Sequence, residues 1–170
     1  PPLCTSKPHL CAWAPNHQQL LLCTDTGAWA LEQEHSYASL PVTQPILGAS
    51  YSLQGKYVAW LDEHQQLHVD TADFSRRLRT YDLRTSQAYQ AAPMALRAGP
   101  LLDDDSLFGQ VFDKGGLGGS GVYAMAWCKD NAVALAMCEH ILLLGPYEEP
   151  LVFHVRGIPH IYSSPDGLHV

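Results

Sequence analysis

The chain of 170 residues is poor in charge, since Asp, Glu, Lys and Arg make up 16% of it, against about a quarter in ordinary globular domains. Lys and Arg number 10 and the net charge is -7, which argues against nucleic acid binding, because neutralising phosphates requires clustered Lys and Arg. No apolar run approaches the ~20 residues that a helix needs to cross a bilayer. The composition therefore argues against a nucleic-acid-binding protein and against a membrane-spanning helix.

Motifs that carry catalysis or bind metals are also lacking. Ser120 does not lie in a G-x-S-x-G elbow, because Val122 stands at the second glycine position. His64 and His68 have an H-x3-H spacing, but no cysteine pair of zinc-site spacing accompanies them. The acidic run 103–105 lacks the glycine and distal glutamate of a calcium loop. We therefore expect no catalytic residues, no cofactor and no metal.

The cysteines show no dense spacing, and their number, 5, is odd. Most of them sit inside apolar segments, where a thiol behaves as a small hydrophobic side chain. The sequence also has no Asn-X-Ser/Thr glycosylation site. These features favour a reducing, cytosolic setting. The cysteines are Cys4, Cys11, Cys23, Cys128 and Cys138.

Short apolar segments separated by polar turns fill most of the chain, and apolar residues make up 46% of it. Segments of this kind at close, even spacing are typical of all-β sandwiches, barrels and propellers. Four tryptophans, Trp13, Trp29, Trp60 and Trp127, fall mostly within them, and we expect these side chains to pack in the core. The predicted strands cover 9–14, 20–24, 28–31, 46–52, 57–61, 67–71, 77–83, 122–128, 132–137, 141–144 and 151–155, with 158–162 opening a further unit.

The strands form three passes of roughly 40 residues each, which is the blade period of a β-propeller. The sequence therefore predicts an all-β fold, part of a WD40-like propeller with several four-stranded blades, although no Trp-Asp dipeptide occurs and a β-sandwich is the main alternative. Residues 1–84 and 122–170 are interpreted as blades of one domain. The chain starts at Pro1 and stops inside a predicted strand, so we expect it to be an excerpt of a longer protein.

Residues 85–121 break this rhythm with Ala-rich, Asp-rich and Gly-rich pieces. Such a composition buries too little apolar area to offset the entropy of ordering it, so a mostly flexible insertion is expected, in which 107–112 docks locally. Gly116, Gly118 and Gly121 match G-x-G-x-x-G, and a distant alternative is a nucleotide-binding enzyme using Gly116–Gly121. That alternative requires a helix over about 121 to 135, whose N-terminus would face the pyrophosphate.

The only basic cluster consists of Arg76, Arg77, Arg79 and Arg84. One hypothesis is a patch for acidic lipid headgroups or an acidic protein partner. The other is the exposed face of an outer strand, where arginine discourages edge-to-edge pairing of sheets. The second is favoured, and these arginines remain the interaction candidates of the sequence.

Several segments resemble a known family. The family has a Met-Ala/Val-Trp-Cys strand, here Met125 to Cys128, then an apolar strand and a turn ending in glycine, and it closes this region with Asp-Gly-Val-Arg-Ile, here Asp166 to Val170. His169 stands where the family has arginine. These segments, with a weaker collinear match over about 8 to 84, resemble the N-terminal domain of the class C vacuolar protein sorting family, subunit sixteen. The intervening matches are Val133–Met137, Leu143–Pro146, Leu151–Val155 and, upstream, Tyr57–Asp62.

The resemblance implies a propeller followed by an α-solenoid, in a subunit shared by the HOPS and CORVET endolysosomal tethering complexes. It implies a non-catalytic scaffold acting in vesicle trafficking and SNARE-mediated membrane fusion. The implied partners are other class C subunits and, through the solenoid, a Sec1/Munc18-like protein. The implied location is cytoplasmic, peripheral on late endosome, vacuole or lysosome membranes. The alternative is a generic propeller adaptor of another complex.

Overall fold

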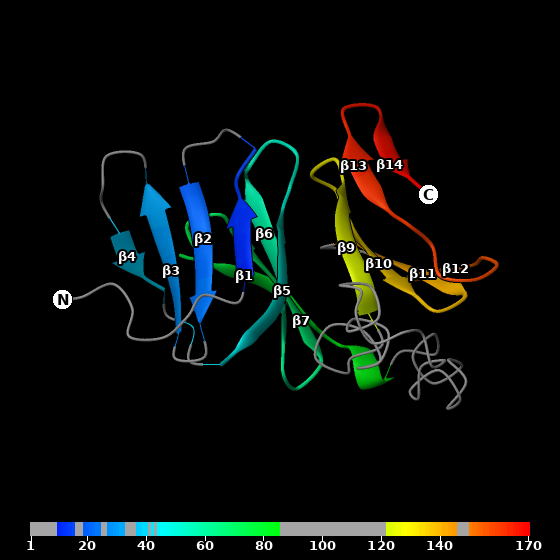
Figure 1. The fold of residues 1–170 in the computed structure, drawn as a ribbon, viewed down its shortest axis with the longest axis horizontal. Helices are drawn as coiled ribbons and strands as arrows, with labels where there is room; N and C mark the ends of the chain where they lie inside the picture. The colour runs from blue at the N-terminus through cyan, green and yellow to red at the C-terminus, as the bar shows by residue number, and fades with distance from the viewer. Residues whose placement is uncertain are drawn as a thin grey trace, which may run out of the picture. The chain divides into compact units, whose positions relative to one another are not determined.

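The computed structural model describes residues 10–15, 19–24, 27–32, 37–40, 42, 44–85, 122–145 and 150–170 (Figure 1). These residues form antiparallel β-sheets and one 3-10 turn, Leu83–Thr85, and no α-helix occurs among them. They fall into two compact units, Pro1–Tyr81 and Asp82–Val170. The all-β prediction is therefore confirmed for the part of the chain that is described.

The first unit holds two four-stranded sheets in which each strand pairs with its neighbour in sequence. Polar turns separate strands of three to six residues, so the chain folds as successive hairpins. The first sheet contains β1 (Leu10–Trp13), β2 (Gln19–Thr24), β3 (Gly27–Glu32) and β4 (Tyr37–Ser39). The second contains β5 (Ile46–Tyr51), β6 (Tyr57–Asp62), β7 (Gln66–Thr71) and β8 (Arg77–Asp82).

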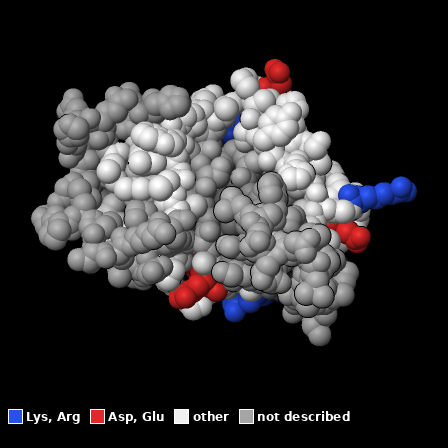
Figure 2. Space-filling model, viewed as in Figure 1, with Lys and Arg blue, Asp and Glu red and all other residues white. Residues whose placement is uncertain are grey.

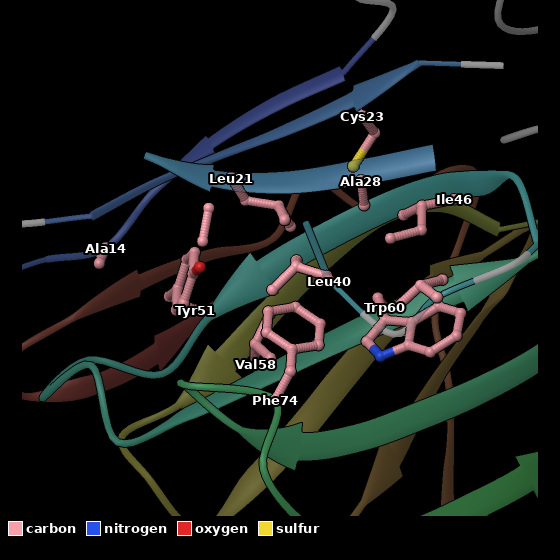
Figure 3. Close-up of a cluster of buried hydrophobic side chains, with 12 residues drawn as sticks. Ala14, Leu21, Cys23, Ala28, Leu40, Ile46, Tyr51, Val58, Trp60 and Phe74 are labelled. Carbon is pink, nitrogen blue, oxygen red and sulfur yellow. The ribbon is translucent and has the colours of Figure 1, made fainter. Parts of the chain in front are cut away.

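The core of the first unit lies between these two sheets (Figure 3). Leu21 and Cys23 project from β2 toward Val58 and Trp60 of β6, and Leu40 and Phe74 complete the cluster from the loops. Alternation of buried and less buried residues along β2 and β5 matches the period of two of a strand with one face in the core. Burial of these apolar side chains is the main stabilising contribution.

Burial also controls the reactivity of the thiols in this unit. Burial, with the neighbouring Cys11 adding to it, raises the pKa of Cys23 to about 12, whereas Cys11 is exposed. Because the thiolate is the nucleophile, we expect iodoacetamide to alkylate Cys11 in the native protein and Cys23 only after unfolding. Peptide mass spectrometry with and without urea measures this, and native labelling of Cys23 at the rate of Cys11 would contradict the packing in Figure 3.

The second unit holds one four-stranded sheet and a hairpin. Ser163 of the hairpin fastens it to β9, because its hydroxyl donates to the Trp127 carbonyl at 2.6 Å and accepts from the Trp127 amide at 3.0 Å. The hairpin strands (red in Figure 1) accordingly lie beside β9 (yellow). The sheet has the order β12-β11-β10-β9, with β9 (Val122–Cys128), β10 (Ala132–Met137), β11 (His140–Leu144) and β12 (Leu151–His154), and the hairpin contains β13 (Tyr162–Ser164) and β14 (Gly167–His169).

Three expectations from the sequence are corrected. The last predicted strand, 158–162, is wrong, because β13 begins only at Tyr162, and the short strand β4 was not predicted. Trp13 is 60% exposed rather than packed in the core. The nucleotide-binding alternative is wrong, because 122–128 and 132–137 are strands where it requires a helix. Of the predicted insertion 85–121, Thr85 ends the 3-10 turn, and residues 86–121, with Gly116–Gly121 among them, lie outside the described residues.

Candidate interaction surface

A carboxylate–imidazole–hydroxyl network, buried at Asp62 and His68 and exposed at Thr80, runs across the second sheet of the first unit. Asp62, at the end of β6, is fully buried and accepts from the Gln66 amide at 2.8 Å. His68 of β7 lies with Nε2 at 3.1 Å from Asp62 Oδ2 and Nδ1 at 3.0 Å from the Thr80 hydroxyl. A carboxylate only accepts, so His68 Nε2 carries the proton and donates to Asp62, while Nδ1 accepts from Thr80. The side chains of Asp62, His68 and Thr80 thereby satisfy one another's hydrogen bonds, which favours a structural role for this network.

A second buried pair, Trp60 and Asp70, contacts this network through the ring of His68. Trp60 donates its indole N–H to Asp70 Oδ2 at 2.7 Å, and its ring lies 4.1 Å from the His68 ring between centroids. Arg77 donates to both oxygens of Asp70, at 2.9 and 3.2 Å, and its guanidinium lies 5.1 Å from the centre of the Trp60 ring. The arrangement pairs the buried Asp70 carboxylate twice and holds β8 against β7.

The titration of His68 gives this network a pH dependence. Burial lowers the pKa of His68 below its ordinary 6.5, against the hydrogen bond to Asp62, and Arg77 lowers it further. As pH falls through 6.5 the unfolded chain binds a proton that the folded chain resists, so stability falls below pH 6.5 and is level above it. We expect the urea midpoint of the wild type to decline over this window more steeply than that of His68→Gln. Equal slopes for the two proteins would contradict the prediction.

The four arginines that are the sequence's interaction candidates make different contacts in the structure. Arg77 is paired with Asp70, and Arg84 makes a two-point ion pair with Asp82 at 2.8 and 3.0 Å. Arg79 lies with its guanidinium 5.0 Å from the centre of the Tyr81 ring, and Arg76 is exposed. On the face shown in Figure 2, most of the described surface is neither Lys or Arg nor Asp or Glu. Their role in binding a lipid or a partner stays a prediction.

The feature that sequence reasoning missed is the outer strand of the second unit. Leu151, Val152 and Phe153 of β12 are 53%, 38% and 50% exposed, and His154 after them is exposed too. Alternation of apolar and polar residues would have indicated in the sequence that only one face of this strand is buried. The actual sequence is apolar at three consecutive positions, a pattern that predicts a strand but does not indicate whether the strand is exposed. β12 is consequently the candidate interaction surface of this unit.

β8, the outer strand of the second sheet of the first unit, provides an internal comparison. It carries Arg77 and Arg79, and charged side chains of this kind discourage other strands from pairing with an edge. β12 holds the same outer position in its sheet and has no Lys, Arg, Asp or Glu among its residues. The edge of β8 therefore carries charged side chains that discourage pairing with another strand, whereas the edge of β12 carries none.

Other kinds of site were sought among the described residues. They contain no group of three or more His, Cys, Asp or Glu that could hold a metal ion. In the same part of the chain, no helix is long and apolar enough to cross a membrane. His64 is exposed, whereas His68 is buried and hydrogen-bonded to Asp62. The two histidines of the H-x3-H pair are therefore not positioned to bind the same metal ion.

Comparison with known proteins identifies the fold. No protein-family model matches the chain, and no curated protein matches it. Many solved chains do match. One is a WD40 propeller chain in the crystal structure of the mitotic checkpoint complex, similar with a TM-score of 0.56 over 98% of this chain at 11% sequence identity. The chain has the fold of part of a WD40-like β-propeller.

The propeller chain of the mitotic checkpoint complex is longer than this one. The chain spans 46% of its length, which fits a partial propeller of the successive four-stranded sheets described above. At 11% identity the likeness shows the fold alone. The propeller architecture serves many unrelated functions, so the function must be argued from the surface this chain presents.

Proposed function

We propose that this chain is a non-catalytic scaffold that binds other proteins. The observation that carries the proposal is the WD40-like framework of successive four-stranded sheets. Such a framework presents a rigid surface with short outer strands and loops to partners. The polar cluster most similar to a catalytic group, Asp62, His68 and Thr80, is satisfied within the sheet and supports its packing.

More specifically, we propose a propeller segment of the class C vacuolar protein sorting subunit shared by HOPS and CORVET. Support comes from the resembling segments that coincide with strands of the second unit, in chain order. Met125–Cys128 lies in β9, 133–137 in β10, 151–154 in β12, and 166–170 includes β14. The proposed partners are other class C subunits and a Sec1/Munc18-like protein bound through a C-terminal solenoid. The proposed location is the cytoplasmic face of late endosome, vacuole or lysosome membranes.

The resemblance also supports a less specific reading. Trp127 is fully buried and its neighbour Ala126 on β9 is buried too, so part of the shared pattern serves core packing that any propeller needs. A generic propeller adaptor of another complex would therefore carry similar segments. The two candidates differ in the proteins they hold rather than in the fold.

Affinity purification of the full-length protein from its own cells, followed by mass spectrometry, separates them. We expect recovery of a Sec1/Munc18-like protein together with other large propeller–solenoid subunits. Recovery of a different set of proteins would support the generic adaptor and overturn the tethering assignment. An intact, soluble protein that recovers no other protein at all would overturn the scaffold proposal itself.

A further inference from the structure

We propose that β12 binds an extended segment of a partner protein as an added, antiparallel fifth strand. The inference deepens the proposed scaffold function and rests on it. The partner segment is expected to be apolar in its middle and acidic toward its N-terminal end. Three features of β12 and its surroundings carry the inference: the direction of its backbone groups, its apolar side chains and the charge at its end.

The backbone of β12 has one edge that faces away from β11. The Val155 amide donates to the Glu139 carbonyl at 3.0 Å, in the register that pairs Phe153 with Ile141 and Leu151 with Leu143. Hydrogen bonding alternates along an antiparallel pair, so Leu151 and Phe153 bond to β11. The amides and carbonyls of Val152 and His154 therefore point away from the sheet. Among the described residues, no strand pairs with this edge.

Apolar side chains lie on both faces of this edge. Leu151 and Phe153 project to one face and Val152 to the other, because successive residues of a strand alternate. All three are exposed by more than a third of their surface. An extended chain beside β12 would place side chains against both faces while satisfying the outward backbone groups. A globular surface would cover one face and leave the backbone groups unpaired, so an extended segment is the occupant that fits.

Charge sets the polarity of the segment. Arg156, two residues beyond β12, is exposed and forms no ion pair among the described residues, and His154 is exposed at the same end. In an antiparallel pair the N-terminal end of the added strand lies opposite this end of β12. An acidic side chain there would pair with Arg156, whereas a basic one would be repelled. The net charge of -7 opposes a second copy of the chain as the occupant.

The test uses the full-length protein and a fluorescein-labelled hexapeptide, Asp-Thr-Asp-Val-Ile-Val, whose residues would face Arg156 through Leu151 in order. Two methylated forms serve as a matched pair. N-methylation at Ile removes the amide that would donate to Val152, and N-methylation at the preceding Val removes an amide that would face solvent. We expect the first to weaken binding about tenfold or more, as the loss of one edge hydrogen bond implies, and the second to leave it unchanged.

Variants of the protein provide the reciprocal pair. Val152→Pro removes the outward amide at an edge position that tolerates proline, and Val152→Thr keeps it. We expect Val152→Pro to weaken peptide binding about tenfold or more and Val152→Thr to bind as the wild type does. On binding, hydrogen exchange should slow at the amides of Val152 and His154. Unchanged circular dichroism of both variants confirms that they fold.

Several results would overturn the proposal. Peptide binding that is unchanged by N-methylation and by Val152→Pro would show that β12 is an apolar patch to which no strand pairs. Absence of peptide binding would show that the edge of β12 is not a binding site. Binding only after Phe108 and Phe112 are changed to serine would mean that this chain's own 107–112 occupies β12. Concentration-dependent dimerisation lost in Val152→Pro would mean a second copy. Recovery of tethering subunits without peptide binding would overturn this inference alone, whereas peptide binding without any co-purifying protein would overturn the scaffold proposal.

Discussion

Replacing Trp127 with alanine is expected to lower the free energy of unfolding of the second unit by about 3 to 5 kcal/mol. Trp127 is fully buried on β9, opposite Val133 of β10, and neighbouring strands cannot close the cavity that its removal leaves. Its backbone also anchors Ser163, so a displaced β9 loosens the hairpin as well. Urea unfolding followed by far-ultraviolet circular dichroism measures the change.

The chain offers a matched control for this substitution. Trp13→Ala makes the same chemical change at a side chain that is 60% exposed, so we expect a loss within about 0.5 kcal/mol. The contrast isolates burial from the identity of the residue. Equal losses for Trp127→Ala and Trp13→Ala would contradict the assignment of Trp127 to the core.

Asp62→Ala is expected to cost about 3 kcal/mol in the first unit. The carboxylate is fully buried and receives hydrogen bonds from the Gln66 amide and from His68. Alanine leaves both donors without an acceptor, and a buried donor that loses its partner costs about 1 to 3 kcal/mol. The His68–Thr80 bond would remain, so the local loss should not extend to β8 as a whole.

Asp62→Asn is the control for this change. Asparagine keeps an acceptor for the Gln66 amide, and its amide group can donate to His68 once the imidazole carries its proton on Nδ1 and donates to Thr80. We therefore expect a loss of about 1 kcal/mol, measured by the same urea titration. A loss as large as that of Asp62→Ala would mean that charge on Asp62, rather than hydrogen bonding, stabilises the sheet.

The local sequence pattern was sufficient to predict most strands, because a short apolar run between polar turns is compatible with few structures other than a strand. β9 and β10 begin and end at the predicted residues, 122–128 and 132–137. β4 was not predicted, since its three residues, Tyr-Ala-Ser, lie in a polar stretch and gain their strand conformation by pairing with β3. Trp13 was misplaced for a related reason: hydrophobicity does not reveal which face of β1 a residue occupies.

The candidate interaction surface was less accessible to sequence reasoning than the fold. An apolar strand in a sheet looks the same in the sequence whether neighbours cover it or not, so Leu151–Val155 was expected to be a strand but not an exposed edge. Exposure depends on strand order, which places β12 outermost. The sequence also did not show that Arg77 and Arg84 form ion pairs with Asp70 and Asp82. Their role in binding a lipid or a partner stays a prediction.

Crosslinking mass spectrometry of the full-length protein in its native complex tests the central claim, that this propeller segment is a scaffold for other proteins. Lys56, in the β5–β6 turn, and Lys129, in the β9–β10 turn, are exposed and offer reactive amines in each unit. We expect crosslinks from this segment to other proteins, and those from Lys129 would report on the unit that carries β12. Crosslinks confined to the protein's own chain, in a preparation where other subunits crosslink to one another, would contradict it.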